Sequence, residues 1–243
     1  MWYDNYQSNT SSIQLKHWCN QYTTHDISYD DFEKTFKSML STGADPHYES
    51  DTVIDFLIEQ DFGELLTFTL ETYTKLFDYT RYAKLLQKVM VAGMTEIVPV
   101  ILSSAKFRTE SLISVIITSI EKDAPFPCIE AILRYDKQII HSPKLLSYLA
   151  ITGRKGILVF LITEGADPHT LDAFELRTFF SKCPQPMPAG VMLRKGLIPP
   201  PDSMPFSLFL SALKLPDTLT PMDYINSPEF DDKYADFCLS CMK

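Results

Sequence analysis

The stretch Gly153–His169 reads GRKGILVFLITEGADPH, and the rest of the chain can be laid out around it. Its apolar body lies between two glycines, which predicts a short helix that ends at Gly165. Glycine readily takes the left-handed conformation that ends a helix, and the proline three residues later prevents the helix from restarting. A near copy, STGADPH, occupies residues 41–47. Two such helix ends predict a repeat.

The position of Gly153 recurs along the chain at steady intervals. Gly93 is followed by apolar residues at the same offsets, and four further segments fit the same register. The glycine position of these segments is held by Asp31, Asp61, Ala124 and Pro184. The six positions are separated by 30, 32, 31, 29 and 31 residues. This period predicts stacked helical hairpins, because one hairpin cannot bury its apolar face alone.

The order of residues in Gly153–Asp167 resembles the second half of an ankyrin repeat. There a glycine, a helix of the pattern VVxLLL and Gly-Ala-Asp follow in fixed register. An ankyrin unit is about 33 residues long, so these units of about 31 residues are slightly short. The Thr-Pro-Leu-His sequence that opens an ankyrin first helix is not intact in this chain, and residues 142–145 (SPKL) match it only weakly. The resemblance implies an all-α solenoid of helix–turn–helix repeats, with another helical-hairpin solenoid as the alternative.

This register predicts an N-terminal cap over 1–29, about six repeats over 30–202, and a C-terminal cap over 203–243. The first helices of the repeats are expected at 51–59, 81–92, 111–122, 143–152 and 173–181. In the N-terminal cap, Ser11 or Ser12 is expected to begin a helix. In the C-terminal cap, helices are expected at 206–213 and, less regularly, at 215–225.

Local residues also predict how several helices begin. Ser50 or Asp51, Thr109 or Ser111, and Ser142 are candidate N-caps, and Pro143 suits the first helical position. Pro99 removes a backbone donor, so it should bend its helix or lie in the first turn.

Composition indicates a folded chain without the features of a membrane or nucleic-acid protein. Hydrophobic residues make up 45% and charged residues 22%, and the formal net charge is −9. This charge disfavours general binding to nucleic acid or anionic membranes, although it allows a local basic patch. No apolar run is long enough for a membrane helix, and the start of the chain lacks the features of a secretory signal.

The cysteines indicate the cellular compartment in which the protein is expected. Five cysteines without a framework spacing suit a reducing environment. We therefore expect a cytoplasmic protein, or one in a host cytosol if it is a secreted effector. Cys128 falls in an apolar helix position and is expected in the core.

The sequence contains no linear catalytic, phosphate-binding or dinucleotide-binding motif. We therefore predict that the chain is not an enzyme and has no cofactor and no metal site. Cys238 and Cys241 form a lone Cys-x-x-Cys, interpreted as part of the cap rather than half of a zinc site or a redox pair. His47 and His169 follow Asp-Pro in their repeats and are expected to be exposed turn residues.

The resemblance implies a binding surface on the concave face and at the turn tips. The partner is expected to be another protein, with no role for nucleic acid or membrane, and the chain is expected to be a monomer in isolation. Aromatic and arginine side chains dominate interface energies. The candidate contact residues of this kind are Tyr48, Tyr79, Arg81, Tyr82, Phe107, Arg108 and Tyr148.

Two classes of function stay open at this point. In the first, the chain is an adaptor or scaffold, and a shallow, extended aromatic groove would favour it. In the second, an enzyme or small-molecule site is assembled from several repeats. A deep pocket lined by carboxylates with perturbed pKa values, histidine or cysteine would favour the second.

Overall fold

The computed structural model describes residues 2–25, 27–73 and 79–242, except for the side chains of 2–9, 48–50 and 79. Helices make up 71% of the chain, and the part that is described contains no strand. The fold is therefore all-α, as the apolar pattern predicts. The chain divides into two compact units, residues 1–136 and 137–243. That boundary falls inside the range 30–202, which the sequence predicts to be one array.

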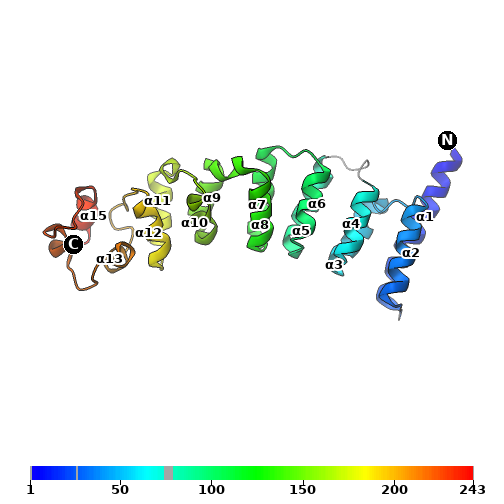
Figure 1. Ribbon diagram of the computed structural model, residues 1–243, viewed down its shortest axis with the longest axis horizontal. Coiled ribbons are helices and arrows are strands. Elements are labelled where there is room, and N and C mark those ends of the chain that lie inside the picture. The colour runs from blue at the N-terminus through cyan, green and yellow to red at the C-terminus, as the bar shows by residue number, and fades with distance from the viewer. Residues whose placement is uncertain (1, 26, 74–78, 243) are drawn as a thin grey trace. The chain divides into compact units, whose positions relative to one another are not determined.

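The first unit is built from successive α-helices that lie side by side (Figure 1). Its helices are α1 (Trp2–Thr24), α2 (Tyr29–Ser41), α3 (Tyr48–Glu59), α4 (Gly63–Thr72), α5 (Tyr79–Ala92), α6 (Ile97–Ser104), α7 (Thr109–Glu121) and α8 (Phe126–Tyr135). Each helix packs against the next helix but one. The odd-numbered helices α1, α3, α5 and α7 contact one another in succession, and so do α2, α4, α6 and α8.

The second unit continues the alternation and ends in shorter helices. Its α-helices are α9 (Pro143–Thr152), α10 (Lys155–Thr163), α11 (Ala173–Ser181), α12 (Pro186–Arg194), α13 (Phe206–Leu213), α14 (Pro221–Ile225) and α15 (Ala235–Ser240). The 3₁₀-helix η1 (Lys137–His141) precedes α9, η2 (Pro168–Thr170) lies between α10 and α11, and η3 (Asp232–Tyr234) lies between α14 and α15. Helix α9 packs on α11, α10 on α12, and α12 on α13.

The predicted first helices agree with the structure. The ranges 143–152 and 173–181 coincide with α9 and α11, and α3, α5 and α7 each begin two or three residues earlier than predicted. Pro99 lies in the first turn of α6, where a missing backbone donor costs no helical hydrogen bond.

Left-handed residues end the first helices of several pairs. Gly93 (φ +80°) follows α5, and Gly153 (φ +76°) follows α9. At the equivalent ends of α3 and α7 the residues are Asp61 (φ +57°) and Asp123 (φ +58°). Aspartate visits this conformation more readily than most residues. The left-handed residue in the fourth copy is therefore Asp123, one position before the predicted Ala124.

Several side-chain contacts within the first unit share one sequence separation. Four interactions join residues that are 33 positions apart. The Tyr73 hydroxyl donates to the Leu40 carbonyl at 3.1 Å, and the Thr95 hydroxyl lies 3.3 Å from the Cys128 sulfur. Cys128 is fully buried, as predicted. Side chains of neighbouring helical pairs therefore meet in space.

Two predicted helix starts are wrong, and one is confirmed. Helix α3 begins at Tyr48 with no side-chain cap, so Ser50 and Asp51 lie inside it. Helix α7 begins at Thr109 and is also without a side-chain cap, because its cap position is held by Arg108; the Thr109 hydroxyl donates to an Asp136 carboxylate oxygen at 2.7 Å. Ser142 is the predicted cap of α9 and accepts from the Leu145 amide at 3.3 Å.

Residues near the N-terminus also differ from expectation. Helix α1 begins at Trp2, so neither Ser11 nor Ser12 starts it. The buried Ser12 hydroxyl instead accepts a hydrogen bond from the Asp45 amide at 2.9 Å. His47, expected in an exposed turn, is only 7% exposed and lies 2.6 Å from an Asp51 carboxylate oxygen. His169 is exposed, as predicted.

The C-terminal segment is held by an aromatic cluster. Phe209 of α13 is fully buried and packs against the rings of Tyr224, Tyr234 and Phe237. Helix α13 coincides with the predicted range 206–213, but only Pro221–Ile225 of the predicted range 215–225 is helical. Thr220 begins that short helix with a reciprocal capping box, and Pro221 takes its first position.

Candidate functional site

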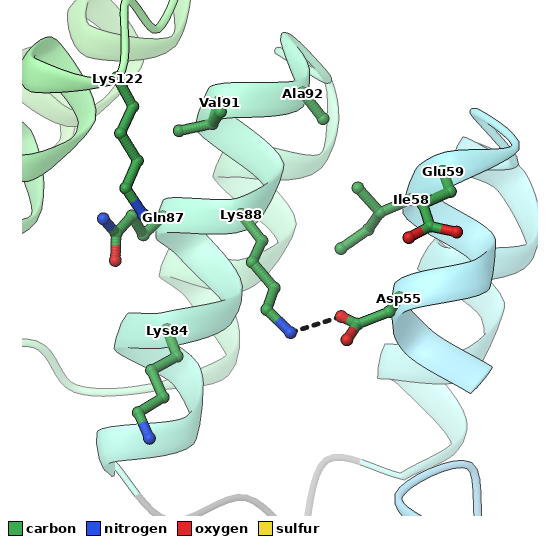
Figure 2. Close-up of a pocket in the computed structure, with 9 residues that line it drawn as sticks. All are labelled: Asp55, Ile58, Glu59, Lys84, Gln87, Lys88, Val91, Ala92 and Lys122. Atoms are coloured by element: carbon green, nitrogen blue, oxygen red, sulfur yellow. Dashed lines mark hydrogen bonds and ion pairs between the residues drawn. The ribbon is translucent and has the colours of Figure 1, made fainter. Parts of the chain in front are cut away.

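An open groove of about 510 Å³ lies between α3 and α5, with one residue contributed by the end of α7. Figure 2 shows the side chains that line it. They come from α3 (Asp55, Ile58 and Glu59), from α5 (Lys84, Gln87, Lys88, Val91 and Ala92) and from the residue after α7 (Lys122). We call this the α3–α5 groove. Because α5 contacts both α3 and α7, the groove draws on three successive first helices.

The amphipathic pattern of α5 decides which of its residues reach the groove. One side of the helix is buried and contains Tyr82, Leu85, Leu86, Val89 and Met90. On the opposite side, Arg81, Lys84, Lys88 and Val91 are all exposed. Their spacing of three, four and three residues places them along one face of a helix. We call Arg81, Lys84 and Lys88, together with Lys122, the basic stripe.

The charges along the groove are unevenly paired. The Lys88 ammonium forms an ion pair with Asp55 across the gap between α5 and α3 (Figure 2). Both side chains stay more than a third exposed, so the pair is a surface ion pair. Within the described part of the chain, neither Lys84 nor Lys122 forms an ion pair. These two ammonium groups are therefore available to a ligand.

The groove also presents apolar surface beside the charges. Ile58 projects from α3 toward α5 in Figure 2. Val91 is 38% exposed, and Ala92 beside it is exposed as well. Such surface next to polar groups is typical of protein interaction sites, whose centre is apolar and whose rim is charged.

The structure separates the contact residues that the sequence predicts. Arg81 and Arg108 are exposed, Phe107 and Tyr148 are half-buried, and the side chains of Tyr48 and Tyr79 lie outside the described residues. Arg81 belongs to the basic stripe. Phe107 and Arg108 directly precede α7, whereas Tyr148 is in the second unit.

Tyr82 does not have the exposed position that was predicted for it. Its side chain is only 3% exposed, on the buried side of α5, and burial raises the pKa of its hydroxyl. Tyr82 follows Arg81 in sequence, and neighbours on a helix point about 100° apart. Arg81 can therefore be exposed while Tyr82 packs in the core.

The groove residues Lys84, Lys88 and Lys122 are absent from the sequence-based candidates. The spacing of Arg81, Lys84 and Lys88 was a usable signal, since it marks one helical face. Lys122 carries no such signal, because it meets the stripe only through the packing of α7 on α5.

A second groove in the same unit has the opposite charge. It measures about 460 Å³ and is lined by α4, α6 and neighbouring residues: Asp61, Gly63, Glu64, Thr67, Phe68, Glu71, Glu96 and Ile97. We call it the α4–α6 groove. Its apolar side chains are Phe68 and Ile97, and the Lys37 ammonium lies 5.4 Å from the Phe68 ring centre. Its four carboxylates have no basic residue among them.

The Cys238 and Cys241 thiols do not have the properties of an activated redox pair. Burial raises the pKa of Cys238 to about 11, and it also raises the pKa of Cys241. A redox-active thiol needs a lowered pKa, because the thiolate is the nucleophile. Cys238 lies instead in the buried part of the C-terminal segment, beside Phe237.

In the described ranges, no three histidine, cysteine or carboxylate side chains are grouped so that they could hold a metal ion. In the same ranges, no helix has the length and apolar character needed to span a bilayer.

We compared the chain with protein-family models, with curated proteins and with solved structures, and none of the three comparisons found a match.

Proposed function

We propose that the chain is a protein-binding module of the adaptor or scaffold type, built as an ankyrin-like solenoid. The observation that carries this proposal is the α3–α5 groove, in which exposed apolar and charged side chains from successive first helices line one open surface. An array of this kind offers an extended surface, because each unit adds one helix to the same side.

Two features of the first unit support the solenoid. Each odd-numbered helix packs on the next odd-numbered helix, and each even-numbered helix on the next even-numbered one. Stacked hairpins bury their apolar faces in this way, because one hairpin cannot bury its apolar face alone. Side-chain contacts between neighbouring pairs join residues 29 to 33 positions apart, which is close to the length of an ankyrin unit. The free cysteines, four of them buried, support a reducing compartment such as the cytosol.

The groove is also suited to a protein partner by its chemistry. Val91 and Ala92 offer apolar contact area, and lysine and carboxylate groups at the edge can select the register of a bound segment. The groove is open rather than enclosed, so a chain segment can lie along it. The exposed Arg81 and Arg108, at the starts of neighbouring helices, extend the surface toward the predicted tips.

The test is affinity capture with the intact chain and three variants. Val91→Gln with Ala92→Gln makes the groove polar without adding charge, and both positions are exposed, so the fold should be kept. Ile13→Gln is the matched control, because Ile13 is 51% exposed on α1, outside the groove. The third variant, Arg81→Ala with Arg108→Ala, examines the tips.

We expect a partner protein that the wild type and the Ile13 variant retain and the Val91/Ala92 variant loses. Loss only in the arginine variant would move the site to the tips. Retention by all variants, or no captured protein at all, would contradict the proposal.

A further inference from the structure

The charge of the basic stripe selects a kind of partner for the α3–α5 groove. The formal charge of the chain is −9, yet this groove carries three lysines against two carboxylates. Arg81, on the same face of α5, adds a fourth basic group. A basic surface on an acidic protein stands out against its surroundings, and complementary charge across an interface selects partners.

The ion pairing within the groove indicates that the preference for a negatively charged ligand lies on α5 and α7. Asp55 of α3 is engaged with Lys88, so this carboxylate offsets one lysine. Lys84 on α5 and Lys122 at the end of α7 have no ion pair in the described part of the chain. The other carboxylate, Glu59, lies on α3. A ligand with negative charge would therefore lie nearer α5 and α7 than α3.

The spacing of the stripe suits a polypeptide. Lys84 and Lys88 are one helical turn apart, or about 6 Å along the axis of α5. Alternate side chains of an extended peptide are about 6.6–7 Å apart. Two carboxylates separated by one residue can therefore face both lysines, the one at Lys88 in place of Asp55. Next to the lysines, the exposed Val91 offers a contact for an apolar side chain.

We infer that the α3–α5 groove binds an acidic peptide segment of a partner protein, in which carboxylates face the basic stripe and an apolar side chain contacts Val91. This inference rests on the proposed function and names the chemistry of the partner. At physiological ionic strength the Debye length is about 8 Å. Salt therefore screens the distant carboxylates of this chain, whereas lysines in contact with the ligand act at short range.

Nucleic acid is the less suitable ligand for the same groove. A nucleic-acid strand carries a phosphate at every nucleotide, and binding it takes several cationic contacts along the backbone. Here Asp55 and Glu59 would face such a strand at the α3 side. A peptide can instead place carboxylates only where lysines lie.

The experiment is selection from a random peptide library displayed on phage, using the intact chain as bait. Selected peptides are then synthesised and their affinities measured for wild type and two double variants. Lys84→Glu with Lys122→Glu reverses the unpaired charges of the stripe. Lys34→Glu with Lys106→Glu is the matched control: both lysines are exposed in the same unit, outside the groove, and both double variants change the net charge from −9 to −13.

We expect the selected peptides to be rich in Asp and Glu around an apolar residue. Their affinity should fall roughly tenfold or more in the Lys84/Lys122 variant and much less in the control, and it should weaken with added salt. An equal loss in both variants would overturn the inference, because it would show only an effect of net charge.

Two other results would overturn it in different ways. Neutral or basic peptides that lose binding in the Val91→Gln, Ala92→Gln variant would leave the groove as a protein-binding site but exclude an acidic partner. A single-stranded oligonucleotide that binds wild type more tightly than the selected peptides would replace the peptide as the ligand. If no peptide is selected, both this inference and the proposed function fail.

Discussion

The α3–α5 groove and the α4–α6 groove are built alike and charged oppositely. Each lies in the first unit, between neighbouring helices of one row, and is lined by both apolar and charged side chains. The first has one more lysine than it has carboxylates, and the second has four carboxylates and no basic residue. The same two helical pairs therefore present two surfaces of different charge.

This difference shows why net charge is a poor guide to the charge of one groove. The chain is acidic as a whole, and the acidity predicts a preference for basic partners. The α4–α6 groove fits that average, whereas the α3–α5 groove does not. The α3–α5 groove is the stronger candidate because it combines apolar surface with unpaired basic groups that are set apart from their surroundings.

The largest expected effect concerns the core that both grooves share. Leu86 of α5 is fully buried, and α5 contacts α3, α6 and α7. Leu86→Ala should lower the free energy of unfolding by about 2–5 kcal/mol, because it removes buried methyl groups and leaves a cavity. Urea denaturation followed by circular dichroism measures this. Lys84→Ala, on the exposed side of the same helix, should stay within about 0.5 kcal/mol of wild type.

If Leu86→Ala lowered the free energy of unfolding by less than an ordinary surface substitution does, the view that both grooves share one core would be contradicted. It would mean that α5 does not hold the two faces together, so that each groove would have to be considered separately.

The next effect concerns how the helices beside each groove end. Gly93, after α5, has φ +80°, and Asp61, after α3, has φ +57° and lines the α4–α6 groove. Gly93→Ala should destabilise by about 1–2 kcal/mol, since a Cβ is disfavoured in the left-handed conformation. Asp61→Gly should change stability by less than about 1 kcal/mol, because relief of strain is offset by a more flexible unfolded chain.

The same denaturation measurement checks both substitutions. Equal costs for the two would contradict the view that aspartate and glycine are alternative solutions to one helix end.

The smallest expected effect on folding comes from a substitution that should change peptide binding more than it changes stability. Asp55→Asn removes the ion pair with Lys88, and an exposed pair contributes only about 0–1 kcal/mol to folding. The same change leaves Lys88 unpaired, so an acidic peptide should bind severalfold more tightly. Titration of a selected peptide measures the gain. Glu130→Gln is the control, because it removes the Glu130–Arg134 surface pair outside the groove and should leave peptide affinity unchanged.

Weaker peptide binding by the Asp55 variant would be informative in the opposite direction. It would mean that Asp55 itself contacts the ligand, and the bound segment would then lie nearer α3.

Much of the helical pattern could be predicted from sequence because the signals are local. The apolar spacing after Gly93 and Gly153 placed the second helices, and Ser142 with Pro143 placed the start of α9. Helix starts without a local signal were harder: α3 and α7 have no side-chain cap, so Asp51 and Thr109 misled the assignment of caps.

The candidate site could be predicted only in part. Arg81 was among the sequence-based residues and lies on the basic stripe, but Tyr82 was assigned to the same surface and is buried. Aromatic residues serve equally well in cores and interfaces, so residue type did not distinguish the two roles. The spacing of Lys84 and Lys88 was visible in the sequence, yet it became a site only together with α3 and α7.

The sequence by itself determined the all-α fold, the order of the helices and many of their ends, because the apolar spacing and the Gly, Ser and Pro signals act over a few residues. The tertiary structure alone decided that Asp55 pairs with Lys88 and that Lys122 meets the same groove. These residues are far apart in sequence, 33 positions in the case of Asp55 and Lys88, and their contact depends on how successive helices pack. Periodicity indicates that units stack, but packing decides which side chains meet.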